Sequence, residues 1–381
     1  MGKIYTAMGL MSGTSLDGVD VSIIKSDGDR EFSSILDSYF EYDQDLIEKI
    51  LKIREKITNP EGLNRYLDEI KSLEREITLF HVKAVNETLQ MSKSNVDLIG
   101  FHGQTIFHDP EKKITKQLGD GRLLSQLIKK KVVYNFRQND LKNGGQGAPL
   151  TPIFHNTLAN KLNEKFNLKF PINILNIGGI SNITCTVDWE DSECKNKILA
   201  YDIGPGNCLI DEWIRKNSKK KYDKDGFLAS SGKTDKLIFN QALENFTENS
   251  SYKKSLDVND FDIFFAKGLS LENGAATITD FTAKLIADGM NYAHGKDHPN
   301  IYKWLVCGGG RKNKYLLQSI KNNFEKISID PIDQYEINGD FVESQAFAFL
   351  AIRSLEGMPI SFPSTTRCKD SITGGVIVEN F

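Results

Sequence analysis

The chain has 381 residues, of which 26% are charged and 39% hydrophobic, and its formal net charge is −3. This length can bury two cores, so we expect two domains, while the small negative charge gives no support to nucleic-acid or membrane-surface binding and no apolar run of about 18 residues predicts a membrane span. The five cysteines lack Cys-x-x-Cys or metal-ligand spacing, and the N-terminus lacks a leader pattern, so we expect reduced thiols in a cytoplasmic protein.

A turn rich in Gly, Ser and Thr, at residues 9–18, joins two short apolar runs near the N-terminus. These runs, residues 4–10 and 19–24, are predicted strands. In such a turn, backbone N–H groups and hydroxyls converge without bulky side chains, which is the chemistry of a phosphate cradle. Asp17 lies in the same turn, where a carboxylate suits the magnesium that accompanies ATP phosphates. Taken alone, the pattern favours a plain hairpin turn.

The rest of the first half alternates helical and extended patterns. Apolar side chains at helical spacing predict helices, and short apolar runs predict strands. The predicted elements are helices over residues 43–57, 64–89, 120–131 and 151–165, and strands over residues 96–101 and 131–135. The Gly-rich stretch 144–149 predicts a rigid turn that marks the crossing between domains.

The second half begins with a repeat of the hairpin pattern. Residues 172–177 form an apolar run, residues 178–182 a Gly- and Ser-containing turn, and residues 183–187 a returning strand. One such hairpin in each half of the chain predicts two related domains, each offering a turn to the same triphosphate.

A third glycine-rich loop, Gly308-Gly309-Gly310, follows a predicted strand at 304–307 and precedes a helical pattern at 311–323. Glycines at a strand-to-helix junction let a flat ring or a phosphate lie against the backbone. Residues 201–207 form a further Gly-rich turn, with Asp202 at the end of a strand. The other predictions here are a helix starting at residues 209–216, a polar peripheral insertion at 217–260, helices over 275–290 and 340–353, and a return of residues 374–377 to the first domain.

No P-loop, Gly-x-Gly-x-x-Gly turn after a strand, or nucleophile elbow occurs in the sequence. Two hairpin loops followed by a glycine loop resemble the sugar kinase, Hsp70 and actin superfamily. The chain resembles more closely the 1,6-anhydro-N-acetylmuramic acid kinase family. The segments that carry this resemblance run in the family's order from one end of the chain to the other: residues 8–20, 102–105 with His108, 136–140, 144–150, 152–155, 176–182, 202–207, 307–310 and 373–375.

The resemblance implies an α/β fold of two ribonuclease H-like domains, of the sugar kinase/Hsp70/actin type, with ATP in the interdomain cleft. Residues 1–147 and 366–381 would form the N-terminal domain and residues 148–365 the C-terminal domain. It also implies an ATP-dependent kinase that phosphorylates O6 of 1,6-anhydro-N-acetylmuramic acid while water opens the ring, giving N-acetylmuramic acid 6-phosphate in cell-wall sugar recycling. ATP, Mg²⁺ and the sugar are the implied ligands; the oligomeric state stays open, with a homodimer as one alternative.

The O6 atom of a 1,6-anhydro sugar is an ether oxygen without a proton, so an ordinary kinase reaction cannot start by deprotonating it. The resemblance implies that water attacks C1 instead, and one carboxylate base would activate that water. The resemblance makes Asp140 that base, and Arg137 would help keep it ionised in a helical turn; the alternative is an Asp140 that only caps the turn. The remaining implied site residues are, for ATP and its phosphates, Gly9, Ser12, Gly13, Thr14, Ser15, Asp17, Gly178, Gly179, Ser181, Asn182, Gly204, Gly308, Gly309, Gly310 and Asn313; for the sugar, Gln104, Arg137 and Glu343; and for magnesium, Asp17 and Asp202. Turn stabilisation is the alternative role of the two aspartates, and a solvated helix carboxylate that of Glu343.

Two other functions compete with this interpretation. A kinase for another anhydro sugar, such as levoglucosan, would share the phosphate loops, the water and the base. An ATP-gated binding module of the actin or Hsp70 kind would share only the loops, and Asp140 beside the Gly-Gly-Gln-Gly-Ala-Pro-Leu segment argues against it.

Overall fold

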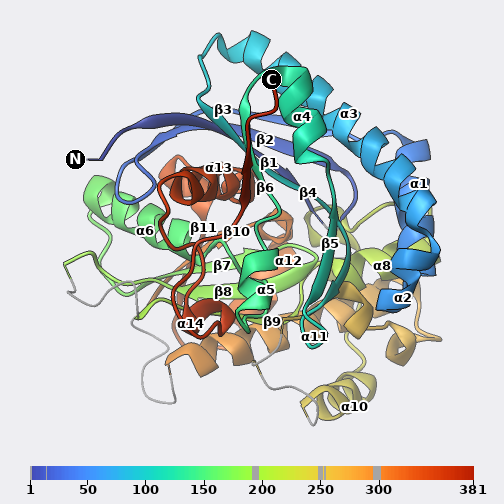
Figure 1. The fold of residues 1–381 in the computed structure, drawn as a ribbon. Coiled ribbons are helices and arrows are strands. Elements are labelled where there is room, and N and C mark those ends of the chain that lie inside the picture. Colours follow the sequence, from blue (N-terminus) through green and yellow to red (C-terminus); the bar gives the residue numbers. More distant parts are fainter. Residues whose placement is uncertain (1, 14, 191–196, 248–251, 253–254, 295–301) are drawn as a thin grey trace. The chain divides into compact units, whose positions relative to one another are not determined.

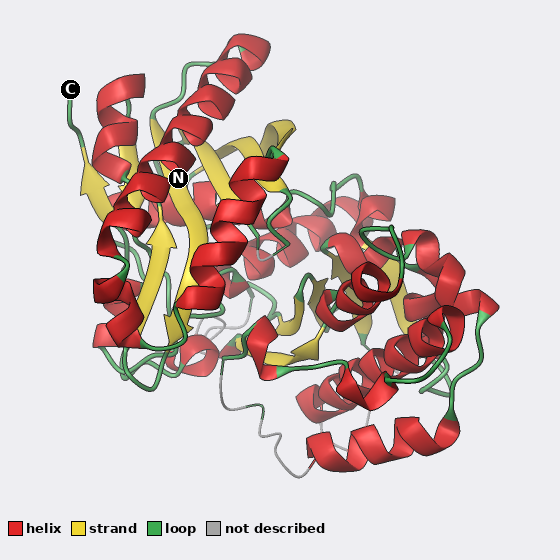
Figure 2. Cartoon of the chain, turned by 90° about the vertical axis from the view of Figure 1, so that its right-hand side faces the viewer, coloured by secondary structure: helices red, strands yellow, loops and turns green. Residues whose placement is uncertain are grey.

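The computed structural model describes residues 2–13, 15–190, 197–247, 252, 255–294 and 302–381. These residues form two compact units, one made of Met1–Lys161 with Phe341–Phe381 and the other of Leu162–Asp340. Each unit is built around its own β-sheet (Figures 1 and 2). None of the described helices combines the length and the apolarity that crossing a membrane requires.

The first unit contains a seven-stranded sheet in the order β12-β6-β4-β1-β2-β3, with β5 paired to β4. Its strands are β1 (Tyr5–Ser12), β2 (Gly18–Ser26), β3 (Phe32–Glu41), β4 (Leu98–Asp109), β5 (Ile114–Leu118), β6 (Lys131–Tyr134) and β12 (Val376–Val378). Its helices are α1 (Gln44–Lys56), α2 (Pro60–Arg65), α3 (Leu67–Ser92), α4 (Gly121–Ile128), α5 (Gln138–Lys142), most of α6 (Pro152–Phe166), α13 (Val342–Leu355) and α14 (Pro363–Thr366). Side-chain caps begin several of them, for example Asp43 at α1 and Asp120 at α4.

The second unit contains a five-stranded sheet in the order β11-β10-β7-β8-β9. Its strands are β7 (Ile172–Ile177), β8 (Ile180–Cys185), β9 (Leu199–Pro205), β10 (Lys303–Cys307) and β11 (Ser328–Pro331). Its longer helices are α8 (Cys208–Asn217), α9 (Phe227–Ser231), α10 (Lys236–Thr247), α11 (Leu271–His294) and α12 (Lys314–Lys321), joined by short 3₁₀ turns. Buried side chains of α11, α8 and the sheet form its core, which includes Trp213, Phe281 and Trp304.

The two sheets share one topology. In each unit, three consecutive strands pair antiparallel, β1-β2-β3 in one and β7-β8-β9 in the other. Two later strands then extend each sheet in parallel: β4 pairs with β1 and β6 with β4 in the first unit, and β10 pairs with β7 and β11 with β10 in the second. This repeated arrangement is that of two ribonuclease H-like units, so the structure confirms the predicted α/β class and the duplicated hairpin plan.

Helix α13 approaches the first sheet so closely that only glycine fits beneath it. Gly9 of β1 and Gly100 of β4 are register partners in neighbouring parallel strands. A Cβ atom on Gly9 would lie 1.9 Å from the Ser344 carbonyl oxygen, and one on Gly100 would lie 2.1 Å from the Phe347 carbonyl oxygen. Nearly every α13 residue is buried, so the helix is a core element with no solvent face.

A buried histidine on α3 holds the end of β1 on the other face of the sheet. The Nδ1 atom of His81 lies 2.8 Å from the Ile77 carbonyl oxygen, which can only accept, so Nδ1 carries the proton. Nε2 therefore accepts from the Ser12 hydroxyl at 3.1 Å, and the Ser12 oxygen in turn accepts from the Tyr42 hydroxyl at 3.0 Å. Burial lowers the pKa of His81 to about 4, so the ring is neutral near pH 7.

Several predicted features differ from the structure. The predicted domain boundaries at 147/148 and 365/366 move to 161/162 and 340/341, because α13 packs on β1, β2 and β4 and the first part of α6 stays with the first unit. The predicted insertion at 217–260 contains helices α9 and α10. The edge strand β3 was not predicted from the sequence, since its polar and apolar side chains are mixed and largely exposed.

We expect Gly100→Ala and Gly9→Ala to destabilise the protein by about 1–3 kcal/mol each, because the new methyl group overlaps α13 backbone that cannot rotate away. Urea unfolding followed by circular dichroism measures the effect. Gly2→Ala is the control, since a Cβ there meets only ordinary contacts, 3.4 Å from Asp27 at the nearest. Equal midpoints for all three variants would contradict the close approach.

We expect stability to fall as the pH drops from about 6.5 toward 4, because unfolded His81 binds a proton in this window and folded His81 does not. The pKa difference corresponds to on the order of 3 kcal/mol. His81→Gln removes the titrating ring, so its unfolding free energy should vary less with pH across this window than that of the wild type. Parallel pH profiles for the two proteins would show that His81 is not the group responsible.

Candidate functional site

The first hairpin turn, between β1 and β2, exposes fewer side-chain donors than the sequence suggests. The Ser12 hydroxyl points into the core, where it donates a hydrogen bond to His81. Only the backbone of Ser12 therefore faces the turn. Ser15 and Asp17 are exposed, and the Ser15 hydroxyl donates to the Asp17 carboxylate at 2.7 Å. The turn is held from the neighbouring strand by Gln104, whose amide donates to the Gly13 carbonyl at 3.0 Å. Thr14 lies outside the described residues.

Gly9 does not lie in this turn. It belongs to β1, and its lack of a side chain is explained by the close approach of α13. Gln104 is fully buried, and its Oε1 atom has no hydrogen-bond partner among the described residues. Its contact with Gly13 therefore gives Gln104 a role in shaping the turn, which the sequence pattern did not indicate.

The second hairpin turn, between β7 and β8, is clamped by the backbone that directly follows β9. The N–H groups of Gly206 and Asn207 donate to the carbonyls of Gly179 and Gly178, both at 2.8 Å. A Cβ atom on Gly206 would lie 2.3 Å from the Gly178 carbonyl oxygen, so this clamp requires glycine. Ser181 is buried and donates to the Pro205 carbonyl at 3.2 Å. The turn is therefore fixed by its own unit.

Asp202 and Asn182 face each other across β8 and β9, because they are register partners in that pair. One Asp202 oxygen accepts from the Leu256 N–H at 2.9 Å and from the Ser255 hydroxyl at 3.3 Å. The Oδ1 atom of Asn182 is buried and has no partner among the described residues. Gly204 lies two residues further along β9. A Cβ atom on Gly204 would lie 3.5 Å from the Leu285 side chain of α11.

The glycine loop lies between β10 and α12, at the strand-to-helix junction that the sequence predicts. Gly308 has a φ of +77°, and a Cβ there would lie 2.5 Å from the Asn176 side-chain oxygen. A Cβ on Gly310 would lie 2.2 Å from Ile177, whereas Gly309 is exposed. Asn313 caps α12, since its Oδ1 atom accepts from the Leu316 N–H at 2.9 Å. The loop thus presents backbone to solvent. The side-chain oxygen of Asn313 is used in capping α12.

Asp140 lies on the short helix α5 with only 1% of its surface exposed. One carboxylate oxygen accepts from the Gly147 N–H and the other from the Thr366 hydroxyl, each at 2.6 Å. A Cβ on Gly145 would lie 2.1 Å from the same carboxylate, which explains a glycine in the neighbouring turn. Thr366 is far away in sequence, so no local pattern could have indicated it.

Arg137 joins Asp140 through the same turn. Its guanidinium donates to the Gly147 carbonyl at 2.7 Å and to His102 Nε2 at 2.9 Å. Burial and the nearby Arg137 charge lower the pKa of His102, so this imidazole is neutral and Nε2 can accept. The structure therefore brings Arg137, His102 and Asp140 together around Gly147. Glu343, in the first turn of α13, is half-buried in the same unit.

Asp17 and Asp202, the predicted magnesium ligands, belong to different units. The described residues contain no group of three or more His, Cys, Asp or Glu side chains arranged to hold a metal ion. A cation at either aspartate would therefore need water or phosphate oxygens to complete its shell, which is the usual situation for Mg²⁺.

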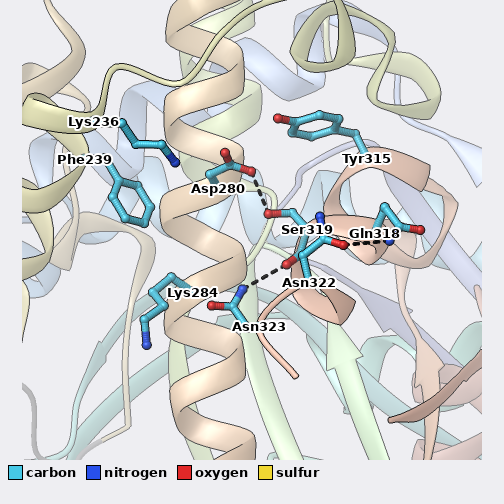
Figure 3. A pocket seen from close by; sticks show the side chains of 9 residues that line it. All are labelled: Lys236, Phe239, Asp280, Lys284, Tyr315, Gln318, Ser319, Asn322 and Asn323. Atoms are coloured by element: carbon cyan, nitrogen blue, oxygen red, sulfur yellow. Dashed lines mark hydrogen bonds between the residues drawn. The ribbon is translucent and has the colours of Figure 1, made fainter. Parts of the chain in front are cut away.

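A pocket of about 290 Å³ lies in the second unit, among helices α10, α11 and α12 (Figure 3). Its lining combines polar and charged side chains with Phe239 and Tyr315 and contains none of the predicted site residues. Asp280 of α11 accepts from the Ser319 hydroxyl of α12 at 2.6 Å, so this carboxylate is used in joining the two helices. The pocket is thus a surface feature separate from the glycine loop and the second hairpin.

Comparison with known proteins matches residues 5–380 to the family described as anhydro-N-acetylmuramic acid kinase. A protein of that name from Pelagibacter ubique is 49% identical over the full length of both chains. One from Rhodopseudomonas palustris is 38% identical over 98% of this chain and 99% of its own, and one from Agrobacterium fabrum is 36% identical over 99% of this chain and 100% of its own. On this evidence of sequence along its whole length, the chain belongs to the anhydro-N-acetylmuramic acid kinase family.

Proposed function

We propose that this protein transfers the γ-phosphoryl group of ATP to O6 of 1,6-anhydro-N-acetylmuramic acid while water opens the anhydro ring. The product would be N-acetylmuramic acid 6-phosphate, formed in cell-wall sugar recycling. The observation that supports this most directly is the family match over residues 5–380, together with relatives of that name that align from end to end. A match of this extent does not favour a levoglucosan-type kinase or an ATP-gated actin-like module.

The proposed reaction needs a base for the attacking water. O6 is an ether oxygen with no proton to give up, so the base does not act there. Water attacks C1, the C1–O6 bond breaks, and O6 takes the phosphoryl group; the proton of the attacking water passes to the base. We assign Asp140 to this role. Its hydrogen bonds from Gly147 and Thr366 fix the orientation of the carboxylate. Each carboxylate oxygen has a second lone-pair direction, so a water can be accepted in addition to these donors.

The ATP-binding groups of the proposal are mostly backbone. The second hairpin and the glycine loop at Gly308, both in the second unit, would hold phosphates and adenosine, and the turn with Ser15 in the first unit would also bind phosphate. Magnesium, held through Asp17 or Asp202 with water, would neutralise charge on the transferring group. For Asp202 this requires sharing a carboxylate that now accepts from Leu256.

For the sugar, we retain Arg137 and Glu343 as contacts and expect Gln104 to act mainly through the Gly13 turn. We also propose a cytoplasmic location, since Cys185, Cys208, Cys307 and Cys368 are free thiols. Neither nucleic acid nor membrane is part of the proposal, and a homodimer stays an alternative to a monomer.

We expect Asp140→Asn to lower turnover by a factor of about 10³ or more, because the amide cannot take the proton of the attacking water. ATP should still bind to this variant. Coupled ADP release measures turnover, and calorimetry with a non-hydrolysable ATP analogue measures binding. Asp370→Asn, at an exposed position, is the control and should keep wild-type rates. Normal product formation by Asp140→Asn would remove Asp140 from the proposed role.

We expect product made in ¹⁸O-labelled water to carry the label at C1 and none in the new phosphate. The reason is that water opens the ring at carbon while the ether oxygen O6 attacks phosphorus. Mass spectrometry of the intact sugar phosphate and of the sugar after phosphatase treatment locates the label. Label in the phosphoryl group would indicate attack of water on phosphorus instead.

A further inference from the structure

Arg311 follows the glycine loop directly, yet its side chain is only 4% exposed. A buried guanidinium is costly unless its donors are satisfied and its charge is balanced. Its position beside the predicted adenosine loop was not singled out from the sequence. The contacts of this one side chain explain how the loop keeps its shape.

The guanidinium is bound on three sides. Its Nε and Nη2 atoms donate to the two Asp333 carboxylate oxygens at 2.6 and 2.8 Å, which is the planar fork that arginine forms best. Its Nη1 atom donates to Asp340 at 2.6 Å and also to the Gly308 carbonyl at 3.0 Å. One nitrogen thus connects the first glycine of the loop to a carboxylate at the end of the second unit.

The backbone of the same region closes around this side chain. The Gly308 N–H donates to the Gly339 carbonyl at 2.9 Å, so both polar groups of Gly308 are fixed. A Cβ on Gly339 would lie 2.4 Å from the Arg311 Nε atom, so the segment fits against the guanidinium only as glycine. Burial alone would lower the pKa of Arg311, but the hydrogen bonds to Asp333 and Asp340 outweigh it and raise the pKa. The guanidinium is therefore charged at neutral pH.

We propose that Arg311 is a positioning residue for nucleotide binding: by holding the Gly308 carbonyl, it keeps the glycine loop in its open, left-handed shape before the nucleotide arrives. This inference rests on the proposed role of the loop in binding ATP. A preformed loop loses less conformational entropy on binding than a mobile one, so a variant that releases the loop should weaken nucleotide affinity in particular.

The test is Arg311→Lys, which keeps the charge but cannot form the fork and reach Gly308 together. We expect the Kd for a non-hydrolysable ATP analogue to rise by about tenfold or more, with the KM for the anhydro sugar and kcat at saturating ATP within about twofold of wild type. Lys165→Ala is the matched control. It removes an exposed ion pair to Glu336, in the segment between Asp333 and Asp340, without touching the loop, and should leave the nucleotide Kd unchanged.

Asp340→Asn is the second variant, because it weakens the hold on the same nitrogen without removing the arginine. If Arg311→Lys does not fold by circular dichroism, this milder variant should still show a raised Kd with an unchanged sugar KM. An unchanged nucleotide Kd in either folded variant, or equal rises in the nucleotide Kd and the sugar KM, would overturn the inference. Failure of the wild type to bind the analogue would instead overturn the proposed function itself.

Discussion

The contact between α13 and the sheet of the first unit is the constraint on which the rest of that unit depends. Backbone oxygens of α13 lie where the side chains of Gly9 and Gly100 would otherwise stand. Because β1 leads into the first hairpin turn and β4 carries Gln104, this contact fixes the two strands that hold this turn. Glu343 is in the first turn of the same helix, so its placement follows from the same packing.

The two hairpins share a topology but are held by different means. Side chains hold the first turn, with Ser12 tied to His81 and Gly13 tied to Gln104. Backbone holds the second, where the N–H groups after β9 bind the carbonyls of Gly178 and Gly179. Substitution should therefore disturb the first turn through distant side chains and the second mainly through its glycines. The two hairpins thus follow the same chain path but differ in the contacts that fix it.

Local patterns were sufficient for most of the fold, because buried strands and amphipathic helices such as β7 and α3 have strong periodicity. They failed for β3, which lies at a sheet edge with many exposed side chains, and for the unit boundaries, which depend on where α13 packs. In the site, glycine-rich turns were visible in the sequence, but the direction of the Ser12 side chain was not. Nor could sequence spacing reveal Thr366 beside Asp140, since the two are joined only by the tertiary fold.

The division of the first unit between the two ends of the chain has a consequence for synthesis. Residues 341–381 leave the ribosome after residues 1–340, and they supply α13 and β12. Until then the glycine face of the first sheet is uncovered and β6 is an unpaired edge. The second unit is contiguous, so we expect it to complete its sheet while the first unit still lacks α13 and β12. The unit whose synthesis begins first is thus expected to complete its sheet last.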